Sequence, residues 1–168
     1  MGAIQSSQVN KVYPFLINTA PQIVAENESI AADASRTATL AQYTVMAYNP
    51  TTAKWVPWSN ATASDGTAYP AGVLMNDGGF TAAQVVAGVT GGVAILIGGA
   101  GLRVDSSQLV FDTGVGGSNV ALSLATIISS NAVGTGTATP YLVMNGASAL
   151  RLAGIFALTT VVEDLAEN

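Results

Sequence analysis

The sequence predicts a mainly β fold with a minor helical part, preceded by an extended N-terminal arm. Short apolar runs such as VAILI (93–97) are punctuated by glycine, a pattern typical of buried strands and turns. An Asn-Pro and an Asp-Gly dipeptide mark turns between such runs. One segment, FTAAQVVAG (80–88), is expected to form a short helix.

The arm is predicted to comprise residues 1–35, extended or disordered when alone. It contains Pro14 and Pro21, which fix φ and bias the preceding residue towards extended geometry. A continuous apolar segment, VYPFLI, lies within it: Val12, Tyr13, Pro14, Phe15, Leu16 and Ile17. This segment either packs on its own domain or docks on a partner, and the sequence leaves both open.

A hairpin is expected to open the folded domain. YTVMAY (43–48) and KWVPW (54–58) flank the turn NPTTA, in which Pro50 suits the second position of a type I turn and Asn49 can cap it. Because Pro57 has no N–H for a ladder, the second strand should be an edge strand or end there. Trp55 and Trp58 are three positions apart, so one is predicted to lie in the core and the other at a rim or subunit contact. The alternative is that both are core residues.

The rest of the chain is expected to add further strands. GVLM (72–75) and VAILI are predicted to be buried strands, and GGAG (98–101) a bulge or sheet corner. The run from Val85 to Leu102 carries no charge, but its glycines favour strands and turns over a membrane span. Residues 114–148 are predicted to be an insertion; within them, 120–128 fit a helix or a strand equally well. YLVM (141–144) and ALRLAGIFALTTVV (149–162) are expected to close the domain as strands.

Composition limits the function. A chain of 168 residues suits one domain, and only 9% of its residues are charged. A surface so poor in charge favours an oligomer or a component of a larger assembly. The net charge is −5 and the five basic residues are scattered, so neither nucleic acid nor an anionic membrane is an expected partner.

Candidate chemistry is sparse. The chain has no His and no Cys, which removes the commonest general base, the commonest nucleophile–base pairs and the usual zinc ligands. Asp65, Asp77, Asp105 and Asp112 do not have the spacing of a calcium loop and are interpreted as turn residues. We therefore expect no enzymatic activity, no metal site and no cofactor.

Four segments, in this order, resemble the lambda-type bacteriophage head decoration proteins: TVMAYNPTTAKWVPW (44–58), SDGTAYPAGVLM (64–75), VAILIGGAGLRVDSSQLVF (93–111) and LRLAGIFALTTV (150–161). The order of the segments carries the resemblance, since no single motif among them is specific. The resemblance implies a small β-rich decoration domain, a mixed sheet or barrel-like, over residues 36–168, with 1–35 as a capsid-binding arm.

The resemblance also implies a role. The protein would be a homotrimer that binds the major capsid protein on the outer surface of the virion, after assembly in the host cytoplasm, and stabilises the shell against DNA pressure. Residues 12–17 would then contact the capsid, and Trp55, Pro57 and Trp58 would be candidates for the trimer or capsid interface. A phage tail, fibre or surface adhesin module is the alternative, because it shares the low charge and the richness in Gly and Thr.

Overall fold

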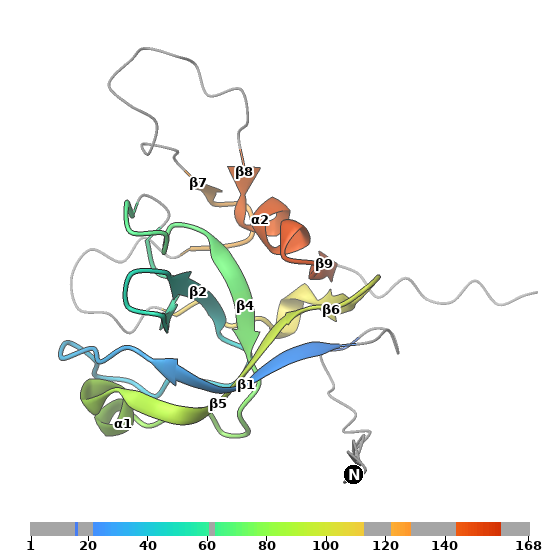
Figure 1. Cartoon of the computed structure of the whole chain (residues 1–168). Helices are drawn as coiled ribbons and strands as arrows, with labels where there is room; N and C mark the ends of the chain where they lie inside the picture. Colours follow the sequence, from blue (N-terminus) through green and yellow to red (C-terminus); the bar gives the residue numbers. More distant parts are fainter. Residues whose placement is uncertain (1–15, 17–21, 61–62, 113–121, 129–143, 159–168) are drawn as a thin grey trace, which may run out of the picture.

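A computed structural model describes residue 16 and residues 22–60, 63–112, 122–128 and 144–158. The fold is mainly β, with two short α-helices among these residues. Its centre is a closed barrel with strand order β1-β3-β2-β4-β5, and a layer of shorter elements packs against one side (Figure 1). The predicted mainly β, barrel-like fold class is therefore confirmed.

The barrel strands are β1 (Ile23–Ile30), β2 (Val45–Asn49), β3 (Lys54–Pro57), β4 (Pro70–Leu74) and β5 (Val89–Gly98). All neighbouring pairs are antiparallel except β1 and β3, which are parallel. The barrel is thus a mixed sheet that closes where β1 contacts both β3 and β5.

The hairpin of β2 and β3 forms where it was predicted. Asn49 Oδ1 accepts hydrogen bonds from the backbone N–H groups of Thr51 and Thr52, at 3.0 and 3.2 Å, which is the expected cap of the turn. β3 ends at Pro57, as its missing N–H requires. It is not an edge strand, however, because β1 covers its other side.

β1 corrects the predicted boundary of the arm. Residues 23–30 were assigned to an extended or disordered arm, but they form a barrel strand whose last residue, Ile30, is fully buried. The polar residues ENES (26–29) interrupt the apolar pattern of this strand, so the sequence did not indicate it. Its irregular pairing with β5 explains the pattern: Asn27 has φ 64°, and its Oδ1 accepts from the N–H of Gly92, while Ser29 Oγ accepts from Gly91. Side chains there replace ladder hydrogen bonds across a bulge.

The helix α1 (Ala82–Ala87) lies within the segment predicted to be helical. Thr81 is its N-cap: the Thr81 hydroxyl accepts from the N–H of Gln84, and the Gln84 side chain accepts from the N–H of Thr81. This reciprocal capping box sets the start of the helix. Val85 is fully buried and anchors the helix to the barrel.

The second layer is built from the C-terminal half. It contains β6 (Arg103–Asp105), the 3₁₀ helix η1 (Ser106–Gln108), β7 (Ile127–Ile128), β8 (Met144–Asn145), α2 (Gly146–Leu152) and β9 (Phe156–Leu158). β6 pairs with β9 in parallel, and β7 pairs with β8 antiparallel.

The strand predicted over 149–162 needs correction. Residues 149–152 are helical, not strand, because Asn145 caps the segment by accepting from the N–H of Ser148, at 2.8 Å; the strand begins only at Phe156. The predicted insertion also contributes to the core, since Leu122, Ile128 and Gly146 pack against barrel residues. Residues 123–126 form a turn. Neither the helix nor the strand considered for 120–128 therefore includes these four residues. Residues 113–121 and 129–143 lie outside the described part of the chain.

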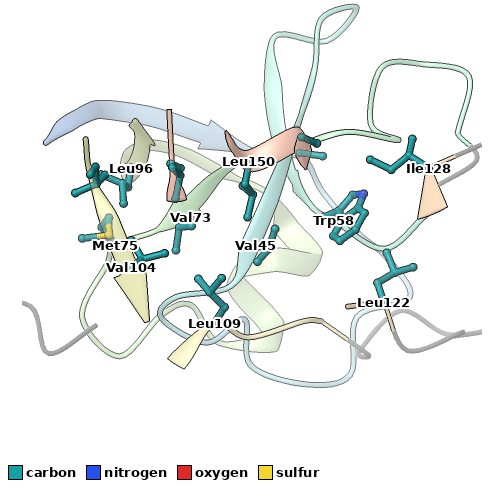
Figure 2. Close-up of a cluster of buried hydrophobic side chains, with 14 of the residues drawn as sticks. Val45, Trp58, Val73, Met75, Leu96, Val104, Leu109, Leu122, Ile128 and Leu150 are labelled. Atoms are coloured by element: carbon teal, nitrogen blue, oxygen red, sulfur yellow. The ribbon is translucent and has the colours of Figure 1, made fainter. Parts of the chain in front are cut away.

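The buried residues in the described part of the chain form two hydrophobic clusters. The smaller receives a side chain from each of the five barrel strands and so lies inside the barrel: Ile30, Met46, Trp55, Leu74, Val93 and Ile95, with Leu40 and Val85. The larger lies between the outer face of the barrel and the second layer, and Figure 2 shows Trp58 within it beside Val45 and Leu150. Neighbouring residues such as Val73 and Leu74 alternate between the clusters, as strand geometry requires.

Gly72 in β4 is expected to tolerate no side chain. An added Cβ would lie 2.5 Å from Cγ2 of Ile95 and 2.9 Å from the carbonyl oxygen of Leu96. We expect Gly72→Ala to lower the free energy of unfolding by about 1–3 kcal/mol, because overpacking displaces neighbours. Urea denaturation followed by circular dichroism measures this. Gly78→Ala is a control for the clash alone, since a Cβ there meets nothing within 4 Å, although its φ of +71° makes an alanine costly for the backbone. It should leave the Ile95 methyl resonances unshifted, and unshifted resonances in Gly72→Ala would contradict the prediction.

Candidate functional site

Leu16 of the predicted arm contacts the second layer of the protein's own domain. Of the six predicted arm contacts, Leu16 is described, while Val12, Tyr13, Pro14, Phe15 and Ile17 lie outside the described residues. Leu16 forms an antiparallel bridge with Val104 of β6 and packs, half-buried, against the larger hydrophobic cluster. At Leu16, therefore, the segment packs on its own domain.

The segments around Leu16 form a small sheet at one end of the molecule. β6 carries Leu16 on one side and β9 on the other, and Phe156 donates its N–H to the carbonyl of Leu102 at 3.1 Å. The turn 99–102 links this sheet directly to the end of β5. The beginning of β1 lies there too, because Ile23 is the register partner of Gly98.

Exposed apolar side chains gather at the same end. Ile23 is 56% exposed and Leu152, at the end of α2, is 75% exposed. Gly98 is the register partner of Ile23 and also lies against Ala153, the residue after Leu152. A Cβ added at Gly98 would be 2.3 Å from the Ala153 carbonyl oxygen. The backbone at Ile23 is therefore close to the end of α2. Figure 1 shows α2, β6, β9 and the start of β1 on one side of the molecule. We call the region of Leu16, Ile23, Leu152 and Phe156 the arm end.

Two of the five basic residues lie at the arm end. The guanidinium carbon of Arg151 is 5.4 Å from the centre of the Phe156 ring, within cation–π range. Arg103 is the register partner of Phe156 in the β6–β9 ladder. Apolar side chains next to arginine are typical of protein–protein interfaces, where arginine and aromatic residues are enriched.

The predicted interface residues on β3 do not belong to this surface. Trp55, at 6% exposure, points into the barrel and donates its Nε1–H to Glu28 Oε2 at 3.0 Å. Trp58 is fully buried in the larger cluster, with its Nε1–H bonded to the Ala68 carbonyl at 2.8 Å. Pro57 is buried as well. The prediction that one tryptophan lies at a rim is wrong: the two do lie on opposite faces, but both faces of β3 are covered.

The sequence interpretation missed Ile23, Leu152 and Phe156 as surface candidates. Two signals could have identified Leu152: the Asn145-x-x-Ser148 spacing of a helix N-cap and Gly154 just after the helix. With the helix in place, Leu150 is fully buried and Leu152 is not. No local signal distinguishes Ile23 from the buried apolar residues.

The aspartates serve local structure. Thr67 donates its hydroxyl to Asp65 at 2.6 Å and its N–H at 3.1 Å, and these bonds lower the pKa of Asp65. Ser107 lowers the pKa of Asp105 in the same way, by its hydroxyl first and then its N–H. Asp65 lies in a bend, in line with the predicted turn, whereas Asp105 ends β6 and is the N-cap of η1. Asp112 forms an ion pair with the buried Arg36.

These carboxylates do not converge. Within the described residues no three acidic side chains are close enough together to hold a metal ion. No helix in the described part of the chain has the length and hydrophobicity needed to span a membrane; the charge-free run from Val85 to Leu102 instead forms the end of α1, β5 and a turn. The arm end, an apolar surface rather than a polar pocket, is therefore the candidate functional site.

Comparison of the chain with protein-family models, with curated proteins and with solved structures finds no match.

Proposed function

We propose that this protein is a non-enzymatic phage capsid decoration protein, which binds the outer surface of the shell as a homotrimer and stabilises it against DNA pressure. The observation that carries the proposal is the arm end. There Leu16 of the apolar segment, two exposed aliphatic side chains and two arginines occur together on a protein whose sequence is otherwise poor in charge. The resemblance of the four segments to the decoration proteins supports the same assignment.

The physical requirements of decoration match these features. A shell protein must adhere without chemistry, and an extended apolar segment can do so by adding a strand to a partner's sheet edge. Three arms acting together would raise avidity about 10²–10⁴-fold over a single arm. The net charge of −5 reduces attraction to the packaged DNA.

The arm is shorter in this proposal than residues 1–35, because β1 belongs to the barrel. Deleting residues 2–15 is expected to leave the barrel folded and to reduce binding to expanded shells at least tenfold, since it removes most of the apolar segment. Co-sedimentation with shells assembled from the major capsid protein of the same genome measures this. Undiminished binding would refute the role of the arm.

A second deletion provides the control for folding. Removing residues 2–30 also takes away β1, which should leave the barrel open between β3 and β5. This variant is expected to lose its cooperative thermal transition, whereas the deletion of 2–15 retains it. Light scattering of the intact protein should give three times the 16.9 kDa chain mass; a monomeric mass would contradict the trimer.

Leu152 tests the arm end without touching the arm. Because its side chain is 75% exposed, Leu152→Asp should change the free energy of unfolding by less than about 0.5 kcal/mol. We expect it nevertheless to weaken shell binding at least tenfold, by placing a charge in an apolar contact. Val86→Asp is the matched control, because Val86 is also exposed, at 41%, but lies on α1, away from α2 (Figure 1). Equal binding by both variants would exclude Leu152 from the interface.

A further inference from the structure

We infer that the edge of β6 opposite β9 is a docking site for the protein's own arm segment, residues 15–17. Docking there would hold the arm in cis on its own domain in the free protein. If the arm binds a shell as proposed above, it must first leave this site; this consequence rests on the proposed function, whereas the docking site itself does not.

β6 is a short strand with two edges to cover. β9 occupies one edge in a continuous register, Arg103 with Phe156, Val104 with Ala157 and Asp105 with Leu158. On the other edge Leu16 forms an antiparallel bridge with Val104. The backbone N–H and C=O groups of a strand edge can pair with a further strand.

Leu16 contributes a side chain as well as a backbone pairing. Antiparallel partners place their side chains on the same face of a sheet, and Val104, its partner, is fully buried in the larger cluster against which Leu16 packs. Strand addition combines these two components, main-chain pairing and a pocket for alternate side chains. The edge of β6 therefore has the elements of a strand-binding site.

The length of this edge matches the arm. Continued in the register of Leu16 and Val104, the pairing would place Phe15 opposite Asp105 and Ile17 opposite Arg103, and it would place Pro14 beyond the end of β6, which is Asp105. Pro14 has no N–H to donate to a strand ladder. In this register it would lie beyond β6, so no ladder hydrogen bond would be lost. The segment that fits is thus residues 15–17.

Such a contact is short and therefore reversible. A bound arm is unavailable to a partner, so the apparent affinity for the partner falls in proportion to the fraction of free arms. Locking the arm on β6 should abolish binding that depends on it.

A disulfide provides the lock. The chain contains no cysteine, so Leu16→Cys with Val104→Cys introduces the only two thiols. Cα atoms of antiparallel partners lie about 4.5–5.5 Å apart, within the roughly 4.4–6.8 Å that a disulfide spans. We expect the full-length double variant to form an intrachain disulfide with oxidised glutathione. Its oxidised form should bind shells at least tenfold more weakly than the same protein reduced with dithiothreitol. Each single-cysteine variant, treated identically, should show no such redox dependence.

The outcomes separate the docking site from the proposed function. Failure to form an intrachain disulfide, or formation only of disulfide-linked dimers, overturns docking in cis. A disulfide that forms but leaves shell binding unchanged overturns the requirement for release. If the disulfide forms but neither redox state nor the unaltered protein binds shells, the docking site stands and the decoration function falls.

Discussion

Replacing Trp58 with alanine is expected to lower the free energy of unfolding by about 3–5 kcal/mol, the usual cost of removing a large buried aromatic side chain. A domain of this size is stabilised by only about 5–15 kcal/mol, so the loss is a large share of its stability. Trp58 is fully buried, and its ring makes an edge-on contact with Phe111 at 6.2 Å between centroids. It also joins the barrel to the second layer, because the start of α2 rests against it. Urea denaturation followed by circular dichroism gives the cost.

Two companion variants separate packing from hydrogen bonding. Trp58→Phe keeps most of the packing but leaves the buried Ala68 carbonyl, now bonded at 2.8 Å, without its donor; we expect a loss of about 1–3 kcal/mol. Gly146→Ala tests the contact from the other side, because its Cβ would lie 2.7 Å from Cη2 of Trp58. Its cost should shrink in the Trp58→Ala background, where the obstructing ring is absent. Strict additivity of these two substitutions would show that the ring and α2 do not constrain each other.

Replacing Asp112 with alanine is expected to cost about 3–5 kcal/mol, because it leaves a buried guanidinium without its counter-charge. The Arg36 side chain is fully buried, and its partner Asp112 is only 8% exposed. Two other donors of Arg36, Nε and Nη2, are bonded to the carbonyls of Ala38, at 2.6 Å, and Thr39, at 3.0 Å, so the guanidinium keeps these bonds in the absence of Asp112. Chemical denaturation at low and high salt measures the cost, which should depend little on salt because buried pairs are weakly screened.

The double variant Arg36→Met/Asp112→Leu distinguishes a buried charge from a general loss of packing. Replacing both partners by apolar residues is often neutral or stabilising, so this variant should be more stable than Asp112→Ala alone. A double variant as unstable as Asp112→Ala would refute the explanation by charge. Neither residue lies at the arm end, so we expect shell binding by the folded fraction to be unchanged.

Trp58 and Arg36 illustrate why part of the structure escapes prediction. Local patterns predicted that Trp55 and Trp58 face opposite sides of β3, because residues three apart on a strand must. Local patterns could not show that both sides are buried. The side of Trp58 is covered by a cluster that includes residues between 96 and 157, far along the chain. Arg36 was one of five scattered bases, and its partner is 76 residues away.

The candidate site was predicted in part. The apolar segment around Leu16 stood out from a polar arm, and the structure places Leu16 at the arm end. The exposure of Ile23 and Leu152 was not predictable from hydrophobicity, because an apolar side chain is exposed only when the rest of the fold leaves it uncovered. Trp55 and Trp58 were better candidates by residue type, yet both are buried.

By itself the sequence determined the elements whose signals are local. The mainly β character, the hairpin of β2 and β3, the helix α1 and the strand β5 follow from turn residues, capping side chains and apolar runs, which act over a few residues. Only the tertiary structure decided the elements that depend on distant partners. β1 is a strand because β3 and β5 each offer it an edge. The helix α2 has a local N-cap signal at Asn145, but only packing against the barrel decides that Leu150 is buried and Leu152 exposed. The arm end exists because barrel closure brings the start of β1 beside the end of α2, residues too far apart in sequence for any local pattern to connect.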